Sequence, residues 1–207
     1  GIRRVPLETK YFEAYNQPNV ELVDVNATPI EAITPTGVRT SAGEIELDVM
    51  IYATGFDAGT GALTTVQIRG RDGKVLGDEW REGIRSYLGL QVHGFPNLFM
   101  GMAPLSPAAA FCNVPTCSQQ QVDWMTDTIA YVRETGRRSI EPSAAAGVVH
   151  HEEVAAATLV PKTKSWYMGS NVEGKKPQLL AYIGGVDAYR VKCDEVKEQG
   201  YQEFELA

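Results

Sequence analysis

Two adjacent arginines, Arg3 and Arg4, lie near the start of the chain, shortly before Pro6. Proline biases the backbone before it towards extended structure, so we expect these arginines on a strand or a loop. A guanidinium stays charged when it is buried and offers a fork of N–H donors. The pair therefore suits an anion, either a phosphate or a negative charge that develops during a reaction. A solvated basic pair without a chemical role is the alternative, and both interpretations stay open.

Aromatic residues, glycines and lysines follow one another in a second stretch, SWYMGSNVEGKK, at residues 165–176. Trp166 has the ring to stack on a planar cofactor, the glycines permit loop motion, and Lys175 and Lys176 supply positive charge. These are the components of a lid over a cofactor. A plain loop without a function has the same composition, so the residues alone leave the choice open.

Histidine and cysteine residues do not form a metal-binding pattern in this sequence. His150 and His151 are neighbours, and adjacent residues on a helix point about 100° apart, so the pair cannot hold one ion together. Cys112 and Cys117 have neither a second cysteine pair nor a nearby histidine. We therefore expect no metal site.

Strand patterns dominate the first 80 residues of the chain. Alternation predicts a strand at residues 19–25, and turns at Thr36-Gly37 and Ala42-Gly43 predict two or three strands between residues 31 and 55. The apolar run at residues 49–53 does not alternate, as is typical of a strand covered on both faces. Residues 66–80 read as a hairpin that turns at residues 71–73.

Helix patterns occupy the second half of the chain. At residues 118–135 the apolar residues recur three or four positions apart: Val122, Met125, Ile129 and Val132. Ser118 is the expected N-cap of this helix and Gly136 its C-cap. Residues 176–201 read as a strand, a tight turn and a final helix. The mixture of strands and helices predicts an α/β fold.

Composition narrows the function further. The 207 residues, 43% of them hydrophobic, suffice for one sizeable core or two modest ones. A net charge of −7 argues against nucleic acid or an anionic membrane as a partner. There is no apolar run of 18 residues and the start lacks the apolar core of a signal peptide. We therefore expect reduced thiols and a cytoplasmic protein.

A series of stretches along the chain resembles the type I Baeyer–Villiger monooxygenases, the family of cyclohexanone and phenylacetone monooxygenases. The stretches are RR before PLETKYFEAYN, then YATGFDAGTGAL, YLGLQVHGFPNLFM, SPAAAFCN, QVDWMTDTIAY, TLVPKTKSWYMGSNVEGK and YIGGVDAYRVKCDEV. They occur in one order and with similar spacing, nearly from end to end. Related flavoproteins share ATGFD, so the whole series carries the resemblance.

The resemblance implies an enzyme that uses FAD, NADPH and dioxygen to insert one oxygen atom beside a ketone carbonyl, giving an ester or lactone through a flavin C4a-peroxide. By position in the family pattern, Arg4 supports the negative charge of this peroxide, and Arg3 replaces a lysine that contacts NADP. Trp166 and Asn171 fall in the family's mobile cofactor loop, at residues 162–177. The family usually has Asn-x-Pro-Gly-Lys there, whereas this chain has Glu173 in place of the proline.

The resemblance also implies a substrate pocket around the stretch PAAAFCN. Small or apolar residues line it, namely Ala109, Ala110 and Phe111 facing the ketone, with Asn113 and Val114 approaching the flavin. Ala181 stands where family members often carry a larger apolar residue. The small side chains predict room for bulky or polycyclic ketones.

On this pattern, residues 1–57 are the returning segment of an NADP-binding domain and residues 58–207 the C-terminal segment of an FAD-binding domain. The expected fold is thus part of a Rossmann-like, two-domain α/β flavoprotein. The Gly-x-Gly-x-x-Gly turns that cradle nucleotides are absent from this sequence. We therefore expect a C-terminal portion that is inactive alone and whose main partner is the missing N-terminal portion of the same enzyme.

Two other functions stay open. The first is a related flavin monooxygenase that oxidises sulfur or nitrogen, which an assay for conversion of ketone to ester would separate. The second is a non-catalytic binding or partner domain of the same architecture. Nucleotide-binding glycine turns before Gly1 favour an enzyme, whereas their absence favours a partner role.

Overall fold

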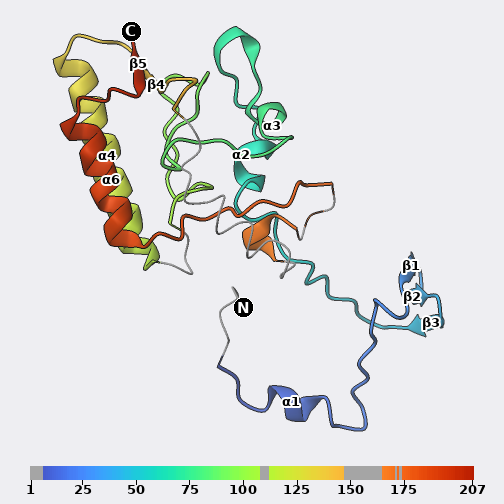
Figure 1. Cartoon of the computed structure of the whole chain (residues 1–207). Helices are drawn as coiled ribbons and strands as arrows, with labels where there is room; N and C mark the ends of the chain where they lie inside the picture. The colour runs from blue at the N-terminus through green and yellow to red at the C-terminus, as the bar shows by residue number, and fades with distance from the viewer. Residues whose placement is uncertain (1–6, 108–111, 147–164, 171, 173) are drawn as a thin grey trace. The chain divides into compact units, whose positions relative to one another are not determined.

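The computed structural model describes residues 7–107, 112–146, 165–170, 172 and 174–207. These residues divide into two compact units, coloured along the chain in Figure 1. The N-terminal unit ends at Gly55 and the C-terminal unit begins at Phe56. This division lies two residues before the predicted boundary at residues 57/58. The assignment of the units to an NADP-binding and an FAD-binding domain stays a prediction.

The N-terminal unit contains one short helix and one small sheet. The elements are α1 (Tyr11–Ala14), β1 (Ile30–Thr34), β2 (Gly37–Thr40) and β3 (Gly43–Glu46). The sheet is antiparallel in the order β1-β2-β3, and its register pairs Val38 with both Ile33 and Ile45. The turns fall at the predicted positions, because Gly37 and Gly43 begin the second and third strands.

Two predicted strands of this unit are absent from the structure. Residues 19–25 and 49–53 have extended or turn backbone without strand pairing. The run at residues 49–53 was expected to be covered on both faces, yet Ile51 is 85% exposed. Both predictions are wrong because a strand needs a hydrogen-bonded neighbour. Within the described part of the chain neither run pairs with another segment as a β-ladder.

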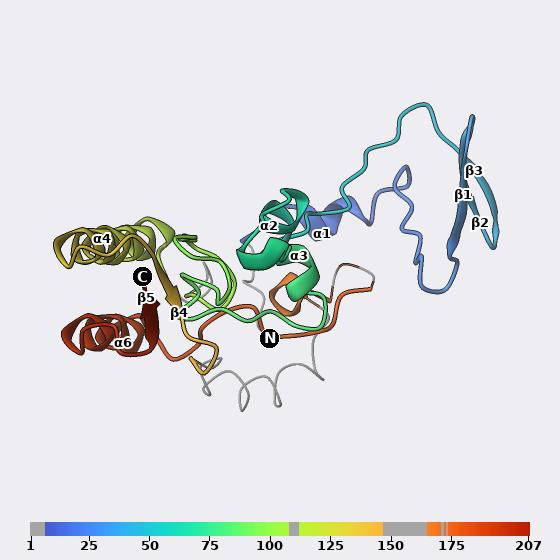
Figure 2. The same ribbon diagram turned by 90° about the horizontal axis from the view of Figure 1, so that it is seen from above.

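The C-terminal unit carries the longer helices. Its elements are α2 (Gly61–Thr65), η1 (Arg71–Gly73), α3 (Leu76–Glu79), α4 (Val114–Glu134), β4 (Ile140–Pro142), η3 (Trp166–Met168), α6 (Val186–Glu198) and β5 (Phe204–Leu206). Helices α4 and α6 lie side by side in both views (Figure 1, Figure 2). Strands β4 and β5 pair antiparallel beside them. None of the helices in the described residues combines the length and apolar character that a membrane span requires.

Helix α4 matches the predicted helix but begins earlier and buries a different face. A proline in its first turn fits the start at Val114, so Ser118 lies inside the helix rather than at its N-cap. Gly136 has φ +70°, and the amides of Gly136 and Arg137 bond back to the last turn as a C-cap. The buried residues are Cys117, Gln121, Trp124, Thr128 and Val132. The predicted apolar face was therefore wrong for Val122 and Ile129, which are exposed, whereas Val132 is buried and Met125 packs half-buried against the core.

Trp124 lies in the core between α4, α6 and the strands β4 and β5. Its side chain is 1% exposed, and its indole N–H donates to the carbonyl of Cys193 at 2.9 Å. The ring lies 6.0 Å from the ring of Tyr201 and 6.3 Å from that of Phe204. The hydroxyl of Thr128 donates to the carbonyl of Trp124 at 2.7 Å. One side chain thus joins both long helices to β5.

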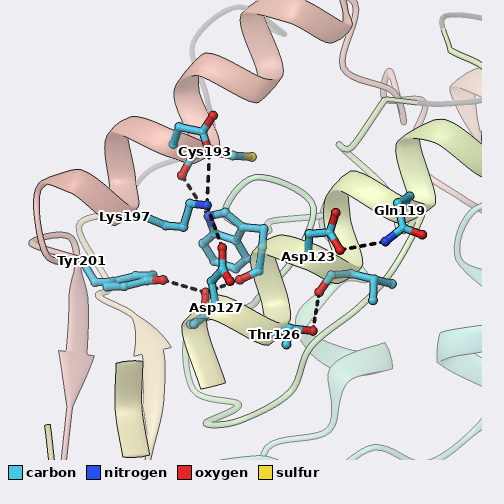
Figure 3. A network of polar contacts seen from close by, with 11 residues as sticks. Gln119, Asp123, Thr126, Asp127, Cys193, Lys197 and Tyr201 are labelled. Atoms are coloured by element: carbon cyan, nitrogen blue, oxygen red, sulfur yellow. Dashed lines mark hydrogen bonds and ion pairs between the residues drawn. The ribbon is translucent and has the colours of Figure 1, made fainter. Parts of the chain in front are cut away.

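A charged contact joins the same two helices at the surface. Figure 3 shows Lys197 of α6 reaching Asp127 of α4, with Nζ and Oδ2 2.9 Å apart. Asp194 lies 3.2 Å from the same ammonium. The hydrogen bond to Asp127, together with the nearby Asp194, raises the pKa of Lys197.

A buried carboxylate holds the predicted hairpin against β4. The chain turns at the predicted residues 71–73, with a single antiparallel bridge between Arg69 and Val75. The second predicted strand is wrong, because Leu76–Glu79 form α3. Glu141 of β4 is 1% exposed; it pairs with Arg71 and accepts the amide of Gly94 at 2.7 Å. This ion pair raises the pKa of Arg71. The carboxylate therefore fixes two loops relative to the sheet.

The three cysteines differ in state. Cys112 and Cys117 form a disulfide in this structure, with Cα atoms 6.4 Å apart, where we expected reduced thiols. The first turn of α4 brings the two residues together. Cys193 is free and buried, and its burial raises its pKa to about 11.

We expect Cys193 to resist alkylation in the folded protein. At about pH 8, a thiol with a pKa of about 11 is ionised to about one part in a thousand, against about one in ten at its ordinary pKa. Labelling of the Cys193 peptide by iodoacetamide, followed by mass spectrometry, should be at least about 100-fold slower in native protein than in urea. Equal rates in both states would contradict this prediction.

Candidate cofactor and substrate site

The predicted site residues fall partly within the described structure. Trp166, Asn113, Val114 and Ala181 are described. The others lie outside the described residues, namely Arg3, Arg4, Ala109, Ala110, Phe111 and Asn171, and so do His150 and His151. Among the described residues, no group of three or more His, Cys, Asp or Glu side chains is arranged to hold a metal ion.

A short turn presents the Trp166 indole. The turn is η3, and the hydroxyl of Ser165 accepts the amide of Tyr167 at its start. The Trp166 and Tyr167 rings are stacked, with centroids 3.7 Å apart and planes 26° apart. Tyr167 is buried whereas Trp166 is 39% exposed. The buried ring therefore supports an indole whose outer part remains accessible for stacking.

The extended 178–182 segment runs beside this turn. The amide of Gln178 donates to the carbonyl of Met168 at 3.0 Å, and the amide of Leu180 donates to that of Tyr167 at 2.8 Å. The side-chain amide of Gln178 also holds the backbone of Ile84, with bonds of 2.7 and 3.0 Å. The predicted strand is therefore an extended segment, which has a single β-bridge at Tyr182.

The same segment bonds on its other side to the loop at residues 101–107. The amide of Leu105 donates to the carbonyl of Leu180 at 3.1 Å, and the amide of Tyr182 donates to that of Ser106 at 3.0 Å. Ala181 lies between these bonds and is completely buried. The structure thus brings together the Trp166 turn, Ala181 and the loop that leads into residues 108–111.

Three residues that the sequence did not single out hold the 101–107 loop. The side-chain carbonyl of Gln121 in α4 accepts the amide of Met102 at 2.7 Å. The hydroxyl of Ser86 donates to the carbonyl of Pro104 at 3.1 Å. A Cβ at Gly89 would lie 2.3 Å from the Ser106 nitrogen, so only glycine fits there. Gln121 could have been found from its spacing, because it lies on the same helix face as Cys117 and Trp124.

Asn113 and Val114 form the start of α4, and both are exposed. The first amide groups of a helix have no partner within the helix and carry the positive end of its dipole. This end of a 21-residue helix therefore suits a polar or negatively charged group of a ligand.

Lys175 joins the end of the Trp166 region to the segment that begins the C-terminal unit. Its ammonium pairs with the carboxylate of Asp57 and contacts the hydroxyl of Thr60. The packing there is tight, because a Cβ at Gly61 would lie 2.8 Å from the Cβ of Asp57. Gly59 has φ +84° and packs on Leu180, with its added Cβ 3.1 Å from that side chain. The small residues after ATGF therefore permit this contact.

Comparison with known proteins shows relatives over the full length of the chain. The acetone monooxygenase (methyl acetate-forming) of a Gordonia species is 51% identical over 211 residues, covering 100% of this chain and 40% of the relative. A Baeyer–Villiger monooxygenase of Pseudooceanicola batsensis is 44% identical, covering 92% of this chain and 35% of the relative. The crystal structure of OTEMO with FAD and NADP matches with a TM-score of 0.87 and 40% identity, over 100% of this chain and 38% of that one. No family model matches the sequence.

The fold is therefore that of part of a flavoprotein monooxygenase, and the predicted α/β fold class is confirmed. The chain spans about two fifths of the length of its relatives, which fits the predicted C-terminal portion. Within this part, the chain belongs to the Baeyer–Villiger monooxygenase family.

Proposed function

We propose that this chain is the C-terminal portion of an FAD- and NADPH-dependent enzyme that inserts one atom of dioxygen beside a ketone carbonyl, giving an ester or a lactone. The missing N-terminal portion of the same enzyme is its main partner. The observation that carries the proposal is the meeting of the Trp166 turn and the 101–107 loop on the 178–182 segment. Relatives named for the oxidation of ketones support the choice of reaction.

The described residues fit both cofactors. When bound, FAD supplies oxygen transfer and NADPH supplies two electrons. The exposed start of α4, at Asn113 and Val114, has backbone amides for the polar edge of a flavin. The accessible Trp166 indole suits stacking on the nicotinamide half of NADP. Arg3 and Asn171 are proposed to contact the same cofactor.

Arg4 is the residue to which we assign charge stabilisation. Its guanidinium remains protonated at any working pH and offers paired donors. Such a group lowers the barrier of a step in which negative charge develops on the transferring oxygen. Ala109, Ala110, Phe111 and Ala181 are assigned to shaping the ketone pocket.

The decisive experiment uses the full-length polypeptide, purified and examined for visible flavin absorption. Incubation with NADPH, a ketone and ¹⁸O-labelled dioxygen should give an ester that carries one label. If the ketone gives no ester, whereas parallel incubations with a sulfide or a tertiary amine give a labelled sulfoxide or N-oxide, the related monooxygenase is favoured instead. A colourless protein that consumes no NADPH would favour a non-catalytic partner domain.

Substitution of Ala181 by phenylalanine should reduce turnover of large ketones more than that of acetone. Because Ala181 is completely buried, the new ring must take its volume from the pocket or from the neighbouring loops. Overpacking typically costs about 1–3 kcal/mol, so thermal unfolding is measured beside turnover. Ala181→Ser, which adds a single oxygen atom, is the control. Full activity of the phenylalanine variant on large ketones would refute the assignment to the pocket.

A further inference from the structure

The contact between Lys175 and Asp57 joins residues 118 positions apart in the sequence. Both side chains are partly buried, with Lys175 28% exposed and Asp57 37% exposed. Thr60 is buried, and its hydroxyl lies 3.3 Å from the same carboxylate. An ion pair that is partly withdrawn from water is screened less than one at the surface. This contact therefore fixes the position of Lys175.

Asp57 is itself held in place by its neighbours, so it can anchor Lys175. Its backbone carbonyl accepts the amide of Gly61 at 3.1 Å. The lack of a side chain at Gly61 lets the two residues approach closely. Asp57 and Lys175 belong to the same compact unit, because that unit begins at Phe56.

Lys175 lies in the loop that follows the Trp166 turn. The loop leaves this turn at Gly169, which has φ +62°, and returns at Gln178, whose amide bonds to Met168. Within the described residues, the ammonium of Lys176 donates to the neutral carbonyl of Glu82, at 3.0 Å. Removal of the negative charge of Asp57 should therefore weaken the contact of Lys175 but not that of Lys176.

We propose that Lys175 and Asp57 form an ion pair that holds the loop after Trp166, between Gly169 and Gln178, in the position that binds NADP. We call this ion pair the latch. The inference rests on the proposed function, since it names the cofactor that the loop serves. The positive charge of Lys175 is used within the chain, to position the loop, rather than on a phosphate of the cofactor. Lys175 and Asp57 are therefore positioning residues.

The two roles of Lys175 predict opposite results for Asp57. If Lys175 serves the latch, Asp57→Asn and Lys175→Met should weaken NADP⁺ binding equally, by about three- to tenfold, and the double variant should be no worse than either. If Lys175 instead binds a phosphate, Asp57→Asn should leave binding unchanged or improve it. That second result would overturn the proposal. Lys175→Arg keeps the charge and should restore binding.

A second readout does not depend on catalysis or on NADP. Hydrogen exchange of the backbone amides between Gly169 and Gln178, in the FAD-loaded full-length protein, should be about fivefold faster in both single variants. Lys197→Met is the matched control, because Lys197 is 29% exposed and pairs with Asp127 in the same way. It should leave exchange in this region unchanged. Unchanged exchange in Asp57→Asn would refute the latch, whereas failure to oxidise ketones would refute only the proposed function.

Discussion

Replacement of Arg4 by alanine in the full-length polypeptide should lower ester formation by about 100- to 1,000-fold, the range seen when one charge-stabilising donor is removed. The reason is electrostatic. In the proposed reaction negative charge develops on oxygen, and a neutral methyl group cannot offset it. Binding of NADP⁺ should change far less, because the lost interaction strengthens mainly in the transition state.

The measurement is the rate of ester formation at saturating NADPH and ketone, with flavin content and NADP⁺ affinity determined beside it. Arg4→Lys is the matched control, because it keeps a positive charge but loses the fork of donors. It should retain intermediate activity. An undiminished rate in Arg4→Ala would remove Arg4 from the mechanism.

Replacement of Trp124 by alanine should lower the free energy of unfolding by about 3–5 kcal/mol. The substitution leaves a cavity between α4 and α6, because the ring is 1% exposed and packs on Tyr201 and Phe204. It also leaves the carbonyl of Cys193 without the indole donor. Chemical denaturation of the full-length protein, followed by fluorescence and circular dichroism, measures the loss.

Two variants separate the causes of this loss. Trp124→Phe keeps most of the ring volume and removes the hydrogen bond, so it should cost less than the alanine variant. Val122→Ala lies on the same helix but is 52% exposed, and should cost less than about 0.5 kcal/mol. A larger loss for Val122 than for Trp124 would mean that the face predicted from the sequence, and not the observed one, is buried.

Local patterns predicted the elements that depend on local chemistry. The turns of the small sheet, the turn at residues 71–73 and the end of α4 at Gly136 follow from residues that favour positive φ or tight turns. The buried face of α4 could not be predicted in this way. Gln121 and Thr128 are polar, and their burial depends on hydrogen bonds to distant segments such as the 101–107 loop.

Side-chain chemistry singled out Trp166, and the resemblance added Ala181. Trp166 and Ala181 meet through backbone bonds of the 178–182 segment, which no side-chain pattern encodes. The pairing of Lys175 with Asp57 was likewise missed, since charges 118 residues apart give no signal in a single sequence. The strands predicted at residues 19–25 and 49–53 are absent, because a sequence pattern does not show whether a pairing partner exists.

The backbone bonds on both sides of the 178–182 segment have a consequence for enzyme engineering. Substitutions on one side of it will be epistatic with substitutions on the other, because both displace the same backbone. Substitutions that enlarge the space around Ala181 should therefore also change the position of the Trp166 side chain. Variants chosen for a new ketone should be screened for hydrogen peroxide released from wasted NADPH as well as for product.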